Sequence, residues 1–218
     1  MCWNAEVSLN TFIFSICTLA FVYYNNEYTQ YKIKEFNNKW IYIFLVLVFS
    51  IQLFEFFIWK NIKNGYNSFF TKILLIVVYF QPIASLMLLS NLTLRNAFLI
   101  PYFIFGIYNI TKIIQTDTIH SSISKNGHLV WNGYKMSLNG ISLTRVYYFL
   151  FVFLLLFSFF YEGKFLYLFF GVITLAIFVY KEIKTSASMW CWIVNLISFF
   201  MLFYILFFLP FFEKKQLC

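Results

Sequence analysis

The chain has 218 residues, of which 62% are hydrophobic and 11% charged, and its mean hydropathy is +0.77. Soluble domains are about half apolar and a quarter charged, so this composition excludes an ordinary water-soluble domain, and disordered, collagen-like and coiled-coil chains as well. It also excludes a soluble nucleic-acid-binding protein, although the net charge is +8. The composition predicts a multi-pass membrane protein whose main partner is the lipid bilayer.

Phenylalanine (32) and tyrosine (16) are abundant, whereas glycine (7) and proline (3) are scarce. The favoured residues have A/T-rich codons, so the aromatic content indicates base composition rather than an aromatic binding site. We expect most aromatic stripes to face lipid. The basic residues should lie in loops near the membrane surface, where they meet anionic lipid.

A hydrocarbon core of about 30 Å requires roughly 20 apolar residues per helix. Seven stretches meet this requirement, and we predict an all-α bundle of seven transmembrane helices forming a single domain over residues 1–218. The stretches are Val7–Tyr24, Trp40–Trp59, Ile73–Ser90, Ala97–Ile114, Val146–Tyr161, Phe165–Tyr180 and Met189–Phe211. The fifth and sixth are short and form a tight helical hairpin. Six helices with one re-entrant segment are the alternative.

The charges around the first span predict the orientation of the chain. Glu6 is the only charged side chain before it, and Lys32, Lys34 and Lys39 follow it. Without a basic segment at the start, a cleavable signal peptide is not expected. Because basic residues favour the cytoplasmic side and the first helix often dominates, we predict an amino terminus outside the cell or in a lumen.

The connections between spans are short except for the extramembrane loop 115–145. The Asn-Gly pair at 126–127 indicates a β-hairpin with a two-residue turn, because both residues tolerate positive φ. In that register Ile123 faces Val130. The loop between the fourth and fifth helices should therefore contain a β-hairpin.

Two histidines lie in this loop. The predicted register places His120 and His128 on opposite faces of the hairpin, because side chains alternate along strands. A metal ion held by both is therefore not expected. The simplest interpretation of each is a surface histidine, and His128, beside an apolar run, is the better candidate ligand.

Glu55 is the only carboxylate well inside a predicted span. An acid at mid-span costs about 2.5–3.5 kcal/mol on insertion scales, so it usually faces protein or water. Gln52 and Trp59 lie on the same helix face as Glu55. A side chain that extends toward the membrane surface is the ordinary alternative. Glu55 is thus a candidate anionic ligand or proton carrier.

Other polar residues occur inside the spans. In the seventh, Cys191, Asn195 and Ser198 share one face, and in the third Gln81 precedes Pro82, which predicts a kink with freed carbonyl groups. The first span carries small polar residues on one face, which predict a close-packed seam with another helix. These residues are Ser8, Thr11, Ser15 and Thr18.

Counting spans brings several chemically reactive groups to one membrane face. Cys2 and Trp3 begin the first helix, Glu55 lies near the end of the second, His128 lies in the hairpin, and Cys191 begins the seventh. Simple packing with inert thiols is one interpretation. A disulfide between the two cysteines, on an oxidising side, is another.

The third interpretation is a metal site that uses Cys2 and Cys191 with the Glu55 carboxylate or the His128 imidazole. Such donors suit Zn²⁺ or copper. The spacing gives little support, since the chain contains no CxxC or HxxxH pattern.

Four short motifs resemble an uncharacterised family of multi-pass membrane proteins from bacteria and large DNA viruses. They are Met1-Cys2-Trp3-Asn4, the run from Gln52 through Glu55 to Trp59, Gln81-Pro82, and the segment from Ser188 to Cys191. Members typically begin Met-Cys-Trp-Ser, and this chain differs at the fourth position. The resemblance implies a family site formed by Cys2, Trp3, Gln52, Glu55 and Cys191, without implying a reaction. The A/T-rich composition fits a viral source.

Better-known seven-helix classes are excluded by their motifs. The seventh span has no lysine for a retinal Schiff base, no span contains a histidine for a serine protease, and the receptor patterns Asp-Arg-Tyr and Asn-Pro-x-x-Tyr are absent. A ceramidase-like zinc hydrolase would require intramembrane Asp and His, which here lie in a loop.

We therefore predict an integral membrane protein with a polar site at its amino-terminal face, either metal-binding or tied by a disulfide. Gln52 and Asn195 would be hydrogen-bond partners of the ligands. One alternative is a conductor of protons or small solutes through Glu55 and Gln81. Another is a structural envelope protein without catalysis. The sequence leaves open whether the chain is an enzyme.

Overall fold

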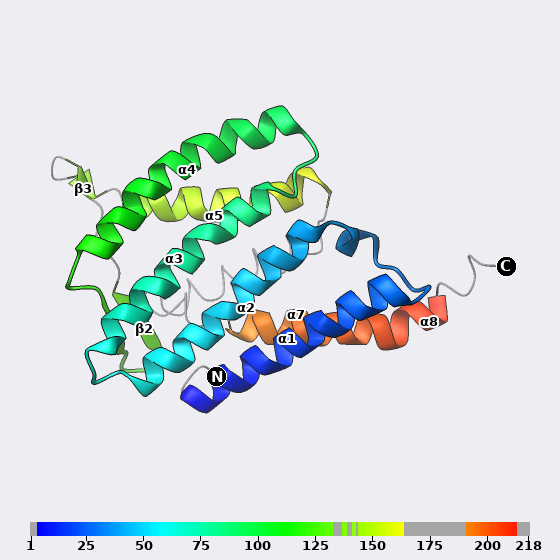
Figure 1. Cartoon of the computed structure of the whole chain (residues 1–218), viewed down its shortest axis with the longest axis horizontal. Coiled ribbons are helices and arrows are strands. Elements are labelled where there is room, and N and C mark those ends of the chain that lie inside the picture. Colours follow the sequence, from blue (N-terminus) through cyan, green and yellow to red (C-terminus); the bar gives the residue numbers. More distant parts are fainter. Residues whose placement is uncertain (1–3, 133–136, 139–140, 143, 164–190, 213–218) are drawn as a thin grey trace.

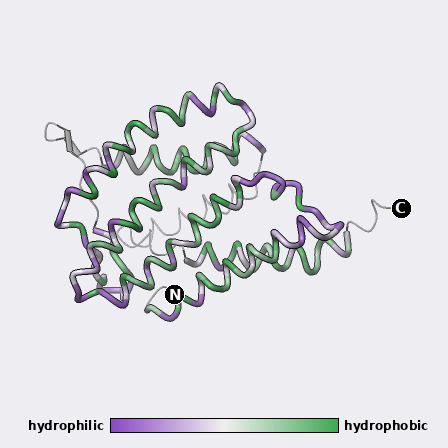
Figure 2. The backbone as a smooth tube through the Cα atoms, viewed as in Figure 1, coloured by the Kyte–Doolittle hydropathy of each residue, from purple (hydrophilic) through white to green (hydrophobic). Residues whose placement is uncertain are grey.

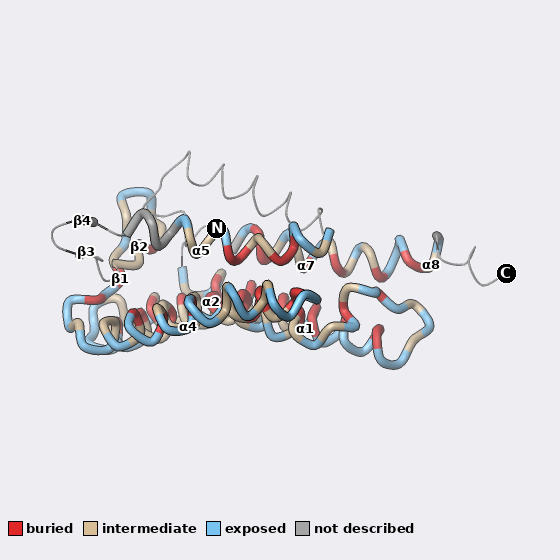
Figure 3. The backbone as a smooth tube through the Cα atoms, turned by 90° about the horizontal axis from the view of Figure 1, so that it is seen from above, coloured by how far each residue is buried: buried red, intermediate tan, exposed pale blue. Residues whose placement is uncertain are grey.

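The computed structural model describes residues 4–132, 137–138, 141–142, 144–163 and 191–212. Four antiparallel helices lie side by side in one layer, and two further helices cover one face of it (Figures 1 and 3). The first layer holds α1 (Ala5–Tyr28), α2 (Lys39–Lys60), α3 (Tyr66–Leu86) and α4 (Leu92–Gln115). The covering helices are α5 (Thr144–Tyr161) and α7 (Cys191–Phe203), the latter continued by the π-helix η3 (Tyr204–Phe208) and by α8 (Leu209–Phe212).

Five of the described helices are long and apolar enough to cross a membrane. They are α1 to α4 and the continuous helix Trp192–Phe211. The middle of each helix is hydrophobic, whereas the connections carry the hydrophilic residues (Figure 2). Because large apolar side chains such as Ile100, Ile104 and Phe199 are exposed on the outer surface, that surface matches lipid rather than water. The chain is an all-α, multi-pass membrane protein, as its composition predicts.

The first four predicted spans and the seventh correspond to these five helices. The fifth predicted span corresponds to α5, whose described apolar part, Phe149–Tyr161, is shorter than the candidate spans. The sixth, at 165–180, lies outside the described residues. The third predicted boundary is wrong at its start, because α3 begins at Tyr66 rather than Ile73. The added turns carry the polar side chains of Asn67 and Thr71, which bind the loop after α4, as described below. α3 then continues as one helix through Pro82.

Asparagine side chains set several helix starts. Asn4 accepts a hydrogen bond from the backbone N–H of Val7 at 2.9 Å, and Asn91 accepts one from Leu94 at 3.0 Å. Such caps satisfy N–H groups that have no partner within the helix. The Asn91 cap explains why α4 begins at Leu92, before the apolar stretch predicted from Ala97.

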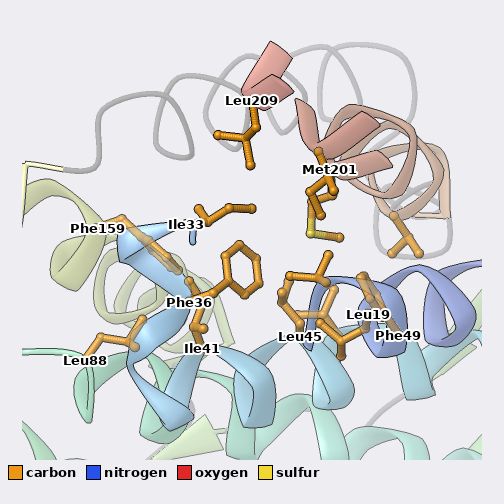
Figure 4. Close-up of a cluster of buried hydrophobic side chains, with 14 residues drawn as sticks. Leu19, Ile33, Phe36, Ile41, Leu45, Phe49, Leu88, Phe159, Met201 and Leu209 are labelled. Carbon is orange, nitrogen blue, oxygen red and sulfur yellow. The ribbon is translucent and has the colours of Figure 1, made fainter. Parts of the chain in front are cut away.

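The connection between α1 and α2 is part of the core. The Asn26 side chain donates to the carbonyl oxygen of Ile33 at 3.2 Å and accepts from its N–H at 2.8 Å. This pairing folds the connection inward, so Ile33 and Phe36 of the short helix η1 (Lys34–Asn37) are buried. They pack with Phe159 of α5 and Leu209 of α8, joining the two layers (Figure 4).

The predicted β-hairpin after α4 is confirmed, but its predicted register is wrong. Strands β1 (His120–Ile123) and β2 (Leu129–Asn132) pair so that Ile123 faces Leu129, not Val130. Gly127 of the Asn-Gly pair takes a positive φ, 77°.

The turn is therefore one residue longer than predicted. The Ser124 hydroxyl accepts from the N–H groups of Asn126 and His128, and the Gly127 N–H donates to the Ser124 carbonyl. These bonds make the three-residue loop that combines a tight turn with a left-handed glycine. A second, unpredicted hairpin follows, formed by β3 (Ser137–Leu138) and β4 (Ile141–Ser142).

Candidate functional site

Glu55 is completely buried in α2, about 8 Å of helix length before its end at Lys60. Its surroundings are mainly apolar: Ile51 and Ile58 of α2, Leu74 of α3 and Leu129 of β2 form a buried cluster there. Neither carboxyl oxygen has a hydrogen-bond partner among the described residues. The side chain therefore does not reach the membrane surface, which excludes the ordinary alternative considered from the sequence.

The inner face of the hairpin lies over this carboxyl group. Leu129 and Trp131 alternate on the same face of β2 and join the cluster that surrounds Glu55. The Trp131 indole N–H approaches the Glu55 carboxyl group without reaching hydrogen-bonding geometry. The loop after α4 thus folds back onto the bundle and supplies one wall of the site.

A polar latch fixes the hairpin to α3. The Asn67 amide donates to the carbonyl oxygen of Ser121 at 3.0 Å and accepts from its N–H at 2.8 Å. The hydroxyl groups of Thr71 and Ser121 lie 2.9 Å apart and share a further hydrogen bond. All three residues are buried, so the latch holds Ser121, and with it the opposite Trp131, in a defined position.

Unsatisfied polar atoms are concentrated at this junction. In the described part of the chain, the buried side-chain atoms without a hydrogen bond include both Glu55 oxygens and the indole nitrogens of Trp59 and Trp131. Trp59 lies one turn after Glu55 on α2. Native proteins leave few such groups, and each carries a cost of about 1–3 kcal/mol. Both oxygens of one carboxyl and two indole nitrogens therefore lie close together without a hydrogen bond to the described residues.

Buried polar side chains continue from Glu55 into the bundle. Gln52 lies one turn before Glu55 on α2, toward the middle of the bundle. The Gln81 amide of α3 donates at 3.3 Å to the carbonyl oxygen of Leu47, which lies nearer the start of α2. One turn after Gln81 on α3, the Ser85 hydroxyl is hydrogen-bonded to the Ser158 hydroxyl of α5 and donates to the Leu155 carbonyl of α5. We call Glu55, Gln52, Gln81, Ser85 and Ser158 the polar column; each is buried.

Asn195 belongs to a different interface. Its amide donates to the Thr11 hydroxyl of α1 at 3.0 Å, and Ser198 donates to Ser15 at 2.9 Å. The predicted seam of small polar residues on α1 is confirmed, and α7 is its partner. In the structure, Asn195 serves this seam between the first and last helices rather than the Glu55 carboxyl.

The remaining predicted ligands are placed only in part. Cys2 and Trp3 lie outside the described residues, and Cys191 is described only as the first residue of α7. His128 is half-buried at the start of β2, and His120 is exposed, with its ring nitrogen 2.8 Å from the Thr118 carbonyl oxygen. The disulfide, and any metal site that uses the thiols, therefore stay predictions.

The described residues contain no group of three or more His, Cys, Asp or Glu side chains that could hold a metal ion. In the observed register, His120 and His128 lie on the same face of the hairpin, contrary to the prediction. They are four residues apart along the ladder, about 13 Å, so the conclusion that one ion cannot bind both still holds.

Sequence reasoning missed Asn67, Thr71, Ser121 and Trp131. Asn67 and Thr71 are one turn apart, a helical spacing that could have signalled a polar face at the start of the third helix. Nothing in the local pattern indicated that the loop 115–145 would supply their partner.

Comparisons with protein-family models, with curated proteins and with solved structures find no match. The resemblance to the family that begins Met-Cys-Trp-Ser, and the viral source, stay predictions that rest on the residues quoted above.

Proposed function

We propose that this multi-pass membrane protein conducts protons and that Glu55 is the group that binds them. The observation that carries the proposal is the complete burial of both Glu55 oxygens without a hydrogen-bond partner among the described residues. Ionisable groups inside membrane proteins are costly and usually mark an ion or proton pathway.

The ligand set favours a proton over a larger cation. A metal cation needs several oxygen, nitrogen or sulfur ligands, and the described residues offer no group of three acidic, histidine or cysteine side chains. A proton requires a single carboxyl. The neighbouring indole groups of Trp59 and Trp131 are hydrogen-bond donors and cannot bind a cation through their nitrogen.

The polar column gives a route away from Glu55. Gln52 and Gln81 follow the carboxyl toward the middle of the bundle, and Ser85 and Ser158 continue in the same direction between α3 and α5. These amides and hydroxyls can hold hydrogen-bonded water, which carries protons. The route leads from the hairpin side of the membrane toward the end of α5.

Helix directions support the seven-span topology, which we include in the proposal. α1 and α7 run the same way, because Thr11 contacts Asn195 and Ser15 contacts Ser198. α3 and α5 also run the same way, since Glu162, after α5, accepts a hydrogen bond from the loop that follows α3.

The antiparallel neighbours α1, α2 and α3 place α1 and α3 in the same direction. α5 therefore ends on one side of the bundle, whereas α7 begins on the other. These directions support the sixth span predicted at 165–180, which lies outside the described residues and which we include in the proposal. We retain an external or lumenal amino terminus as part of the proposal.

Proton flux into liposomes tests the proposal. The full-length protein is reconstituted in vesicles that contain a pH-sensitive dye, and a potassium diffusion potential with valinomycin drives protons inward. We expect flux above that of protein-free vesicles, and its loss in Glu55→Gln. Glu6→Gln, an exposed acid in the first turn of α1, is the matched control and should conduct normally.

A second variant tests the route. Gln81→Leu keeps Glu55 but removes a polar group deeper in the column, so it should lower the flux while Glu55 still reacts with carboxyl reagents. Flux equal to wild type in Glu55→Gln, or no flux above that of empty vesicles, would overturn the proposal.

A further inference from the structure

The hairpin supplies an aromatic side chain at Glu55, a buried carboxyl without a hydrogen-bond partner among the described residues. We infer that Trp131 is the residue that closes the Glu55 site on the hairpin side, and that the β1–β2 hairpin is a hinged cover held by the latch on α3. This inference rests on the proposed function, because it describes how access to the same carboxyl is controlled.

The register of the hairpin determines which side chains face the bundle. Ser121 pairs with Trp131, and Ile123 with Leu129, so these four residues share one face. Ser121 and Leu129 are buried against the helices, whereas Ile123, beside the turn, is exposed. Trp131 therefore lies at the end of the hairpin that is away from the turn, where its indole contacts the cluster around Glu55.

Polar and apolar contacts attach the hairpin to the helices. Among the described residues, Asn67 and Thr71 of α3 both bind Ser121. The apolar attachment of the hairpin is the contact of Leu129 and Trp131 with the cluster on α2 and α3. Two short strands alone are marginally stable, so the hairpin depends on these attachments for its position. Short peripheral elements of this kind open locally at lower free energy than a helix core.

Carboxyl labelling measures access to Glu55 directly and does not depend on proton flux. A water-soluble carbodiimide reaches the carboxyl from the aqueous side, whereas a lipid-soluble one enters through the membrane. The rate of labelling at Glu55 is followed by mass spectrometry of the full-length protein, and Glu55→Gln defines the background. We expect slow labelling of wild type by the water-soluble reagent.

Trp131→Ala should raise the rate of water-soluble labelling several-fold and leave lipid-soluble labelling unchanged. Trp131→Phe, which keeps an aromatic ring, should restore slow labelling. Val130→Ala, the neighbour on the other face of β2, is the matched control and should label like wild type. If Trp131→Ala only loosened the fold, labelling of Glu55 by both reagents would rise, and this result would count against Trp131 as a cover.

A cross-link tests the hinge without removing the tryptophan. The Thr71 and Ser121 hydroxyl oxygens are 2.9 Å apart, so cysteines at both positions are close enough to form a disulfide with a small shift. In the oxidised Thr71→Cys/Ser121→Cys protein, labelling by the water-soluble reagent should fall below wild type and recover on reduction.

Equal labelling of wild type, Trp131→Ala and the locked protein by the water-soluble reagent would overturn the inference. This failure is separate from failure of the proposed function. The predicted labelling pattern together with a flux that is indifferent to Glu55→Gln would retain the cover and reject proton conduction.

Discussion

The side chain of Asn67 binds both backbone polar groups of Ser121, 54 positions further along the chain, at 2.8 and 3.0 Å. β1 pairs with β2 on one edge. On its other edge, the Asn67 amide makes the two hydrogen bonds with Ser121 that a neighbouring strand would otherwise make. The pair therefore connects the start of α3 to the β1–β2 hairpin, although most of α3 and all of α4 lie between them in the sequence. Without it, the wall that Trp131 provides at Glu55 would have no fixed position.

Replacing Asn67 tests this connection. Asn67→Ala leaves the N–H and carbonyl of Ser121 buried without partners, and each costs about 1–3 kcal/mol. We therefore expect a loss of about 2–6 kcal/mol of stability, measured by thermal unfolding in detergent micelles, together with faster aqueous labelling of Glu55. Asn109→Ala is the control, since the Asn109 amide donates only to Phe105 within α4 and its loss should cost less. Equal costs for the two variants would contradict the latch.

Gly106 provides the space in which α3 and α4 approach each other. The Tyr79 and Tyr102 rings stack with centroids 4.8 Å apart and an angle of 4°, and a Cβ at Gly106 would overlap the Tyr79 ring and hydroxyl. Small residues permit such close contacts between membrane helices. Gly106→Ala should therefore destabilise the protein by about 1–3 kcal/mol through overpacking.

Gly65→Ala is the matched control for this substitution, because a Cβ there meets nothing within 4 Å and the backbone is already helical, with φ −58°. Its unfolding temperature should equal or exceed that of wild type. If Gly106→Ala is as stable as Gly65→Ala, the close approach of Tyr79 does not contribute to the fold.

The seam between α1 and α7 predicts a measurable coupling. Ser15 and Ser198 are both fully buried and share a hydrogen bond of 2.9 Å. A double-mutant cycle with Ser15→Ala and Ser198→Ala should give a coupling free energy of about 0.5–1.5 kcal/mol, the range for hydrogen bonds between membrane helices. The pair Cys17, whose side chain is exposed, and Ser198 should be additive. Coupling near zero for Ser15 and Ser198 would mean that the seam is held by apolar packing alone.

The sequence predicted the membrane class, the helices and the seam on α1 because these depend on local periodicity. Hydrophobic length identifies a span, and small polar residues one turn apart identify a face that meets another helix. Glu55 was identified on the same grounds, since a lone acid in an apolar stretch is costly wherever the helix packs.

What the sequence did not predict depends on tertiary contacts. Asn67, near the start of α3, binds Ser121, and Trp131 opposite Ser121 is partly buried; no local pattern in the sequence contains this contact. The predicted register of the hairpin was wrong because the turn between Ser124 and His128 has three residues rather than two, with Gly127 at a positive φ. A shift of one position changes which side chains face the bundle, and therefore which residue covers Glu55.

The most direct test of the central claim is infrared spectroscopy of the reconstituted protein during a pH titration. If Glu55 binds and releases protons, the carbonyl stretching band of a protonated carboxyl group will appear and disappear with pH in wild type and in Glu6→Gln. The same band will be absent from Glu55→Gln. A band that never responds to pH, or that responds equally in Glu55→Gln, would contradict the assignment of Glu55 as the proton-binding group.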